Sequence, residues 1–514
     1  MLDSRQEQKS SKSIGWGAVL GYIGLALSIV SGLLFTPWIK EAIGKSDYGI
    51  YTLSTSLVNI FLLDFGLSAT ANTFLARYQA EKDEEGARNF LAVIYRLFLI
   101  VDALVLIAFV FAFFCIDSIY VGLTAEERES LRATFLIAAG FSVVSFPCTV
   151  FSGVLQAYEK FISIKLIDIV QRLFFIGASA LCIVFGWGLI GLVSVNFLSA
   201  LLCHILRYLI IRFSIKIKAN FRYKANKAFV KRVLFYSGWA AVQSIASRLV
   251  FNIMPSILGI VSNTDEITTF SFISQLEGYV YMFGSVMGGF FLPKIARLKQ
   301  EENSRERLDK LAVTVGKVQF FFVGLIFAGF MACGKDFIFL WLKDDPDTDA
   351  IYIGTLIIIA YQLVFVPEMV FYNEMFISDF VRPLAIGSLI KAALNCGLAF
   401  LLGHFYGAMG AAISVAVSRV FELVYINCAY RTKLRTSLKT FFSKTYLATA
   451  PALVLSALAG LLISWFVPLN HLPRLILSGC SVIVIFVLFY WFVGTSKDER
   501  AAAKSFLAAK RRKQ

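Results

Sequence analysis

The sequence contains little charge for its length. Only 16% of its 514 residues are charged, whereas a soluble globular domain carries about 25% charged residues. Hydrophobic residues make up 58% of the chain, and the mean hydropathy is +0.73. This balance excludes an ordinary soluble domain and predicts an all-α polytopic membrane protein.

Cysteine and histidine are also scarce, and neither is clustered. The eight cysteines are scattered through apolar segments without a CxxC pair, which is typical of small packing residues and not of a disulfide or zinc framework. His204, His404 and His471 are far apart in the sequence. A Walker motif and a nucleophile–base arrangement are absent as well. We therefore expect no metal, no cofactor and no enzymatic activity, so that uphill work would need a proton or sodium gradient.

Long apolar runs are abundant instead. A helix that crosses a bilayer needs about 20 mostly apolar residues, and the sequence predicts fourteen such spans. The run 167–211 is divided at Gly186 and Gly188, because glycine pairs break helices. The predicted spans are 15–39, 47–75, 90–116, 132–158, 167–186, 189–211, 234–261, 267–293, 317–341, 351–377, 383–404, 408–430, 445–466 and 474–494.

The positive charges fall in alternate loops. If the N-terminus lies in the cytoplasm, the loops on that side contain most of the Lys and Arg residues, and the loops on the other side are short or acidic. This is the positive-inside pattern. It explains the net charge of +15 by topology, argues against a nucleic-acid partner and predicts that both termini are cytoplasmic.

A basic linker separates two halves of the chain. Residues 212–232 contain eight Lys and Arg residues and no acid. Such a segment either lies against anionic headgroups or guides an anionic lipid substrate. A faint repeat relates TFLARYQAEKDEE (73–85) to FFLPKIARLKQEE (290–302). The predicted domains are a six-helix bundle (1–211), the linker (212–233), a second six-helix bundle (234–430) and two further helices with a basic tail (431–514).

The N-terminal 90 residues resemble the Wzx-type polysaccharide flippases, which transport O-antigen and related lipid-linked oligosaccharides. The similar parts are GLLFTPWIKEAIGKSDYGIYTLSTSL (32–57) and LLDFGLSATANTFLARYQAEKDEE (62–85). The superfamily also contains the lipid II flippase and the MATE antiporters. Two departures are visible: Asn252 stands near the position where many relatives have an acid, and the first span lacks the arginines of the lipid II flippase.

The resemblance implies a flippase of the bacterial cytoplasmic (inner) membrane that moves an undecaprenyl-diphosphate-linked oligosaccharide by alternating access, with ion coupling. It also implies membrane lipids, a polysaccharide polymerase and a chain-length regulator as partners. Three alternatives remain open. They are a MATE-like cation-coupled drug antiporter, a lipid II flippase, and a scaffold of a polysaccharide assembly complex that does not transport.

Arg248 lies in the middle of the predicted span 234–261. Charged residues inside a span are costly, and they mark functional sites by default. The four residues on either side of Arg248 include no acid. An arginine offers a planar fork that suits phosphate oxygens. We therefore predict that Arg248 binds an anionic substrate in a cavity.

Three further cations are candidates for the same cationic cavity, but each has a structural alternative. Arg419 has Glu422 at i+3, and an ion pair is equally compatible with this spacing. Lys391 lies about 12 Å inside the cytoplasmic end of its predicted span at 1.5 Å per residue, and its long side chain can instead extend toward the interface. Arg172 has Asp168 at i−4, which favours a local salt bridge.

Acidic residues within the spans form a second set of candidates. A carboxylate buried in a membrane protein can exchange protons or bind a cation, and can therefore couple transport to an ion gradient. Pro367 directly precedes the candidate Glu368 in the predicted span 351–377. Because proline cannot donate a backbone hydrogen bond, we expect the helix to be loosened there. The predicted coupling or gating residues are Asp64, Glu277, Glu368 and Glu374. The alternative for each is an ion pair with an arginine on another helix.

Overall fold

The computed structural model describes residues 2–62, 66–223, 226–289, 291–378, 380–495 and 500. Within these ranges every regular element is a helix, which confirms the predicted all-α class. Ten helical segments are long and apolar enough to cross a membrane. The count of fourteen stays a prediction, because the helices at 47–75, 234–261 and 267–293 are not among the ten and a single helical segment covers two predicted spans.

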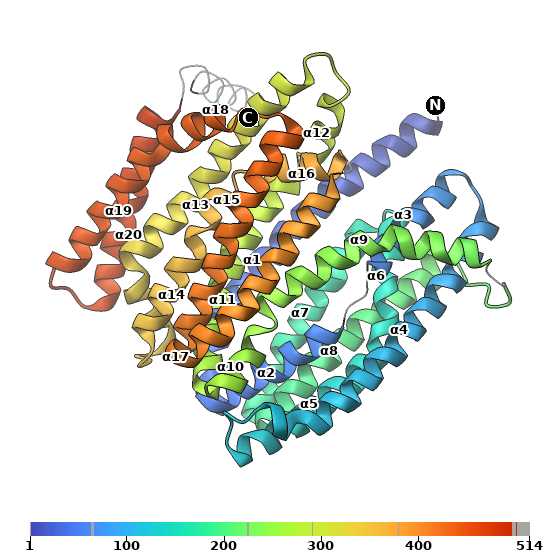
Figure 1. Ribbon diagram of the computed structural model, residues 1–514, viewed down its shortest axis with the longest axis horizontal. Helices are drawn as coiled ribbons and strands as arrows, with labels where there is room; N and C mark the ends of the chain where they lie inside the picture. Colours follow the sequence, from blue (N-terminus) through green and yellow to red (C-terminus); the bar gives the residue numbers. More distant parts are fainter. Residues whose placement is uncertain are drawn as a thin grey trace. The chain divides into compact units, whose positions relative to one another are not determined.

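The chain divides into two compact units, which are shown with the sequence colours in Figure 1. Unit 1 contains residues 1–271 and 392–411, and unit 2 contains residues 272–391 and 412–514. The predicted domain boundaries follow a different division and stay a prediction.

The helices of unit 1 are α1 (Leu2–Ile43), α2 (Lys45–Phe61), α3 (Leu67–Ala80), α4 (Glu84–Ile119), α5 (Ala125–Ser145), the 3-10 turn η1 (Phe146–Thr149), α6 (Val150–Ala157), α7 (Phe161–Val184), α8 (Gly188–Ile210), the π turn η2 (Ile211–Ile215), α9 (Lys227–Phe251) and α10 (Met254–Val261). Within this unit α8 packs against α5 and α7, and α1 packs against α7. Apolar side chains of α3, α4, α6 and η1 form its largest described core cluster, which includes Phe90, Phe98 and Phe146.

The helices of unit 2 are α12 (Leu292–Leu298), α13 (Ser304–Leu342), α14 (Thr348–Ala360), α15 (Gln362–Phe365), α16 (Met369–Ile377), η3 (Tyr430–Leu434), α18 (Leu438–Phe442), η4 (Ser443–Leu447), α19 (Ala448–Phe466), α20 (His471–Phe489) and η5 (Tyr490–Gly494). Two helices, α11 (Thr264–Gly289) and α17 (Val381–Ala429), contribute to both units. Figure 1 shows α13, α14, α19 and α20 running side by side within unit 2, where α13 contacts the other three.

Several predicted spans are broken helices, and glycine or proline stands at some of the breaks. The predicted division of the run 167–211 is confirmed: α7 ends at Val184, and both Gly186 and Gly188 have positive φ. The predicted loosening at Pro367 is also confirmed, since α15 ends at Phe365 and α16 begins at Met369. Such breaks free backbone groups that a continuous helix would satisfy.

A single carboxylate joins three helix starts in unit 1. Glu127 forms a capping box with Thr124 at the start of α5, which satisfies backbone donors of the first turn. Its other oxygen accepts hydrogen bonds from Ser46 Oγ at 2.7 Å and from Thr264 Oγ1 at 2.6 Å. The starts of α2, α5 and α11 are therefore held together by one side chain.

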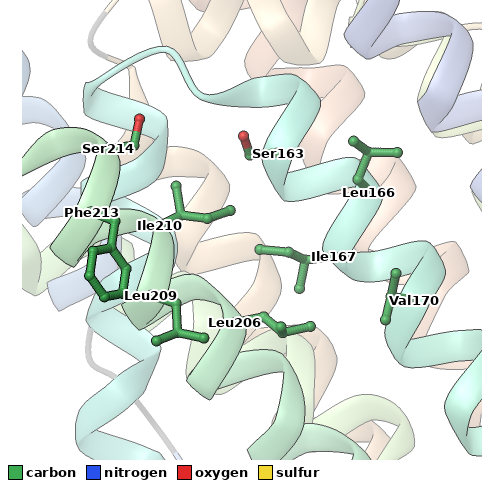
Figure 2. A pocket seen from close by; sticks show the side chains of 9 residues that line it. All are labelled: Ser163, Leu166, Ile167, Val170, Leu206, Leu209, Ile210, Phe213 and Ser214. Carbon is green, nitrogen blue, oxygen red and sulfur yellow. The ribbon is translucent and has the colours of Figure 1, made fainter.

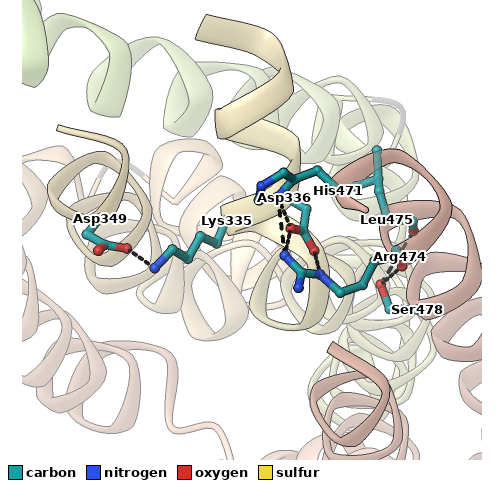
Figure 3. Close-up of polar contacts among 7 residues, drawn as sticks. All are labelled: Lys335, Asp336, Asp349, His471, Arg474, Leu475 and Ser478. Carbon is teal, nitrogen blue, oxygen red and sulfur yellow. Dashed lines mark hydrogen bonds and ion pairs between the residues drawn. The ribbon is translucent and has the colours of Figure 1, made fainter. Parts of the chain in front are cut away.

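The last two helices are attached to α13 by a buried acid. Asp336 accepts hydrogen bonds from Arg474 Nε at 2.7 Å and lies 2.7 Å from Nδ1 of His471, both at the start of α20 (Figure 3). The ring of His471 stacks on Phe339 with 3.7 Å between ring centroids. Because Asp336 is 2% exposed, its ionised form depends on these partners.

The long helix α17 bends at a glycine. Gly407 has φ +52° and ψ −132°, a conformation open almost only to glycine. Next to it, the backbone N–H of Ala408 donates to Glu266 Oε2 at 2.6 Å. The glycine therefore sets the position of the bend, between the predicted spans 383–404 and 408–430.

Replacement of Gly407 by alanine should destabilise the protein, because a Cβ atom at this position would lie 2.3 Å from the Glu266 carboxylate and the backbone would be strained. A residue forced into such a conformation costs about 1–3 kcal/mol. We expect a lower apparent Tm in thermal unfolding of the purified protein. The control is Gly397→Ala in the same helix, where a Cβ atom would contact nothing within 4 Å; an equal loss in both variants would contradict the prediction.

Candidate functional site

A polar cavity of about 460 Å³ lies within unit 1. Such a volume is within the range of small-ligand sites. The wall is contributed by α2, α3, α5, η1, α6, α8 and α9. Its polar lining residues are Thr55, Asn59, Ser68, Ser142, Ser145, Thr149, Ser152, Asn196, His204, Arg207 and Arg248. The described lining contains two arginines and no carboxylate, so it is suited to a ligand with hydroxyl groups and negative charge.

The polar lining comes from two stripes with helical spacing. On α5, η1 and α6, the hydroxyl residues Ser142, Ser145, Thr149 and Ser152 recur every three or four positions. On α8, Asn196, His204 and Arg207 recur at i, i+8 and i+11. Residues with this spacing lie on one face of a helix. Both stripes therefore turn a row of polar side chains to the cavity.

Arg248 lies in the last turn of α9 and lines this cavity, and its predicted role in binding an anionic substrate stays a prediction. Its Nη1 donates to the carbonyl oxygen of Asn59 at 3.0 Å, in the last turn of α2. Carbonyl groups at a helix C-terminus lack partners within the helix and carry partial negative charge, so the contact caps α2. Among the residues that the structure describes, no carboxylate pairs with Arg248. Its positive charge therefore remains available to a ligand.

Three buried polar atoms of the lining have no hydrogen-bond partner in the described part of the chain. They are Ser142 Oγ, His204 Nδ1 and Arg207 Nε. An unsatisfied buried polar group typically costs about 1–3 kcal/mol. Because all three residues line the same cavity, water or a polar ligand in the cavity is the natural partner of these groups.

Arg207 was not among the sequence candidates, because it lies near the end of α8 and resembles a charge of the cytoplasmic interface. Its Nη2 donates to Asp168 Oδ1 at 2.9 Å, and Lys165 also contacts this carboxylate. Asp168 was expected to pair with Arg172. Arg172 instead donates to Ser31 Oγ at 2.9 Å and to the Ser28 carbonyl, which joins α7 to α1.

Four charged residues form a compact network in unit 2. Three of them, Arg419, Lys391 and Glu277, are sequence candidates, and the fourth is Glu422. Arg419 Nη1 donates to Glu277 Oε1 at 2.9 Å, and Lys391 Nζ lies 2.8 Å from Glu422. Both acids are nearly inaccessible. The network has two positive and two negative charges, so it is neutral as a whole. The expected i+3 pairing of Arg419 with Glu422 is thus replaced by a pairing across helices.

Neutral side chains complete this network. Gln362 donates to Glu277, Ser388 donates to Glu422 at 3.2 Å, and the Arg419 guanidinium lies 4.9 Å from the Tyr361 ring centroid. Tyr361 OH also donates to Glu422 at 3.3 Å. Such additional contacts are needed to offset the desolvation of buried charges.

The other predicted acids have different partners. Glu374 accepts from Arg305 Nη1 at 2.8 Å. Glu368 is 1% exposed and accepts a hydrogen bond at 3.0 Å from the amide of Asn427, which is a neutral side chain. Asp64 lies outside the described residues. The functional roles predicted for these acids stay predictions.

The fold is that of a membrane transporter. The lipid II flippase MurJ in its inward closed conformation is 18% identical, with a TM-score of 0.69 over 92% of this chain and 99% of that chain. A multidrug resistance MATE family transporter of the MOP superfamily, in its inward-facing conformation, is 16% identical, with a TM-score of 0.58 over 80% of this chain and 96% of that chain. At these identities the likeness establishes the fold.

The sequence comparison identifies the family within this class of transporter folds. Residues 20–299 match the family described as "Polysaccharide biosynthesis protein", and the chain belongs to this family. The uncharacterized membrane protein EpsK of Bacillus subtilis (strain 168) is 21% identical over 488 residues, which cover 92% of this chain and 94% of the relative. The predicted resemblance to polysaccharide flippases of the superfamily is thereby confirmed, and the chain is a multi-pass membrane protein.

The buried ion pair of unit 2 can be tested by a double-mutant cycle. Arg419→Met alone should destabilise the protein strongly, because it leaves Glu277 charged and without its cation; breaking a buried pair typically costs about 3–5 kcal/mol. The double variant Glu277→Gln/Arg419→Met should recover part of the lost Tm. The exposed pair Lys335–Asp349, drawn in Figure 3, is the control and should contribute less than about 1 kcal/mol. Additive losses in the cycle would show that the two residues do not act as a pair.

Proposed function

We propose that this protein is a flippase that moves an undecaprenyl-diphosphate-linked oligosaccharide across the bacterial inner membrane, with both of its termini in the cytoplasm. The observation that carries the proposal is the polar cavity of unit 1. Its lining offers hydroxyl and amide groups for a sugar and two arginines for a diphosphate. The protein would transport its substrate without chemical change and would work with a polysaccharide polymerase and a chain-length regulator.

The composition of the cavity lining also favours a flippase over two of the three alternatives, the drug antiporter and the scaffold. A cation-coupled drug antiporter requires acidic groups where its cationic substrate binds, whereas the described cavity lining contains arginines and no carboxylate. Lipid II is also an anionic lipid-linked sugar, so a lipid II flippase would use the same chemistry, and the substrate must be separated by experiment. A scaffold without transport has no need for an unpaired arginine in a polar cavity.

The rate of substrate transfer should depend on the positive charge of Arg248. Arg248→Gln retains a donor for the Asn59 carbonyl but removes the charge, and we expect about tenfold slower transfer, because a hydrogen bond to a charged group contributes about 1.5–3 kcal/mol. Arg248→Lys should retain part of the activity, since lysine supplies the charge without the planar fork. The measurement is leaflet transfer of a fluorescent undecaprenyl-diphosphate oligosaccharide in proteoliposomes, with lipid II and a cationic drug as competing substrates.

Arg77→Gln is the matched control, because Arg77 is largely exposed and forms a surface ion pair with Glu81. Its transfer rate should equal that of the unmodified protein. No transfer above protein-free vesicles, with folded protein, would refute the flippase proposal. Full transfer by Arg248→Gln would refute the role of the charge alone.

We also propose that Glu368 is the coupling carboxylate. Glu277 and Glu374 each form an ion pair with an arginine, while Glu368 is held by the amide of Asn427. A carboxylate without a cationic partner is freer to bind and release a proton or sodium ion. Glu368→Gln should preserve Tm and abolish the stimulation of transfer by an imposed proton or sodium gradient. Glu374→Gln should instead lower Tm, because it breaks the pair with Arg305; unchanged gradient stimulation in Glu368→Gln would exclude this residue.

A further inference from the structure

A second, apolar groove lies between α7 and the end of α8 with its continuation η2. It has a volume of about 610 Å³ and is shown in Figure 2. Its walls are formed by Leu166, Ile167 and Val170 of α7 together with Leu206, Leu209 and Ile210 of α8. Leu166, Val170 and Leu209 are each at least 40% exposed. Both α7 and α8 are long and apolar enough to cross a membrane, so we expect these exposed apolar side chains to face hydrocarbon.

One end of the groove is polar. Ser163, in the first turn of α7, and Ser214, in η2, lie at the same end of the groove in Figure 2. Ser214 lies in the first residues of the basic linker, where Arg212, Lys216 and Lys218 are exposed. In the described part of the chain these three residues form no ion pair. The groove thus combines an apolar shaft with hydroxyl groups and unpaired positive charge at one end.

The two acids closest in sequence to the start of α7 have other partners than these basic residues. Asp168, on α7, is engaged by Arg207 and Lys165. Glu159, in the loop before α7, also has an interaction partner and is followed directly by Lys160. The segment from Arg212 to Tyr223 contains no acid. Basic residues are therefore the charged groups of the linker segment that follows the groove.

The groove is separate from the polar cavity. On α8, His204 and Arg207 line the cavity, whereas Leu206, Leu209 and Ile210 line the groove. At 100° per residue, the two sets point roughly 140° apart. The two sites therefore lie on different faces of the same helix. A molecule whose headgroup occupies the cavity does not also lie in the groove without crossing α8.

We propose that this groove is a binding site for one anionic phospholipid, distinct from the transported substrate. An acyl chain lies along Leu206, Leu209 and Val170, and the phosphate group contacts the hydroxyls of Ser163 and Ser214. Arg212 and Lys216 supply the selectivity for anionic headgroups. The bound lipid holds the start of the basic linker at the membrane surface. This site does not depend on the transport function proposed above.

The test is a lipid titration of the purified full-length protein, followed by native mass spectrometry. The probes are phosphatidylglycerol and phosphatidylcholine with identical acyl chains. A basic residue near an anionic membrane surface contributes about a fivefold gain in affinity, so the first phosphatidylglycerol should bind at least tenfold more tightly than phosphatidylcholine. Arg212→Gln/Lys216→Gln should remove this preference and leave phosphatidylcholine binding unchanged.

Variants of the groove itself separate its role from that of the surface charge. Leu209→Trp and Val170→Trp should fill the groove and weaken the first binding event of both lipids by tenfold or more. Both positions are exposed, so normal elution and Tm are expected. The control Arg431→Gln/Lys433→Gln removes two exposed basic residues from η3 of unit 2 and should have no effect on the first binding event.

Two results would overturn the proposal. One is unchanged phosphatidylglycerol affinity in both the charge and the groove variants. The other is a competition result: equimolar undecaprenyl phosphate displaces the first bound phosphatidylglycerol from the unmodified protein but not from Leu209→Trp. This result would assign the groove to the polyprenyl chain of the substrate.

Discussion

The low dielectric of a membrane interior makes an uncompensated charge very costly, and the contact between Arg419 and Glu277 satisfies this constraint most completely. Arg419 and Glu277 lie on different helices and are both buried. Lys391 and Glu422 add a second pair, and Tyr361, Gln362 and Ser388 occupy remaining hydrogen-bonding positions. Because the charges balance, the network can hold α11, α14, α15 and both arms of α17 together within unit 2.

Arg248 meets the same constraint in a different way. Its partner is the carbonyl oxygen of Asn59 at the end of α2, and the described chain gives it no carboxylate. A helix C-terminus offers only partial negative charge, so the guanidinium keeps most of its capacity to attract an anion. Because α2 ends at Phe61, the carbonyl of Asn59 lies in a last turn, where carbonyl groups lack partners within the helix. A helix that continued at this point would offer no free carbonyl to Arg248.

Much of the fold could be predicted from the sequence because hydropathy and glycine act locally. The helical class, the division at Gly186 and Gly188, and the break at Pro367 all follow from residues within one or two turns. Pairings between distant residues could not be predicted in this way. Arg419 has an acid at i+3, yet it pairs with Glu277, which is 142 positions away. Spacing within one helix carries no information about which other helix packs beside it.

Only part of the candidate site could be predicted, because only some of its residues carry a local signal in the sequence. Arg248 stands out because the sequence near it offers no acid. Arg207 and His204 do not stand out, since a cation near a helix end is expected at a membrane interface. The signal that could have revealed them is the polar stripe of α8, together with the hydroxyl stripe from Ser142 to Ser152. Single serines in an apolar span carry little information, whereas their helical spacing indicates a common face.

The two kinds of polar group in the cavity also differ in how strongly they bind. Thr149 Oγ1 and Ser145 Oγ donate to carbonyl groups of their own helices, so toward a ligand they mainly offer lone pairs. A neutral hydrogen bond contributes only about 0.5–1.5 kcal/mol net. Arg207 shares its charge with Asp168, which leaves Arg248 as the described cation of the lining without an acidic partner. A site of many weak contacts and few strong ones can recognise a large polar headgroup and still release it, and release is what repeated transport requires.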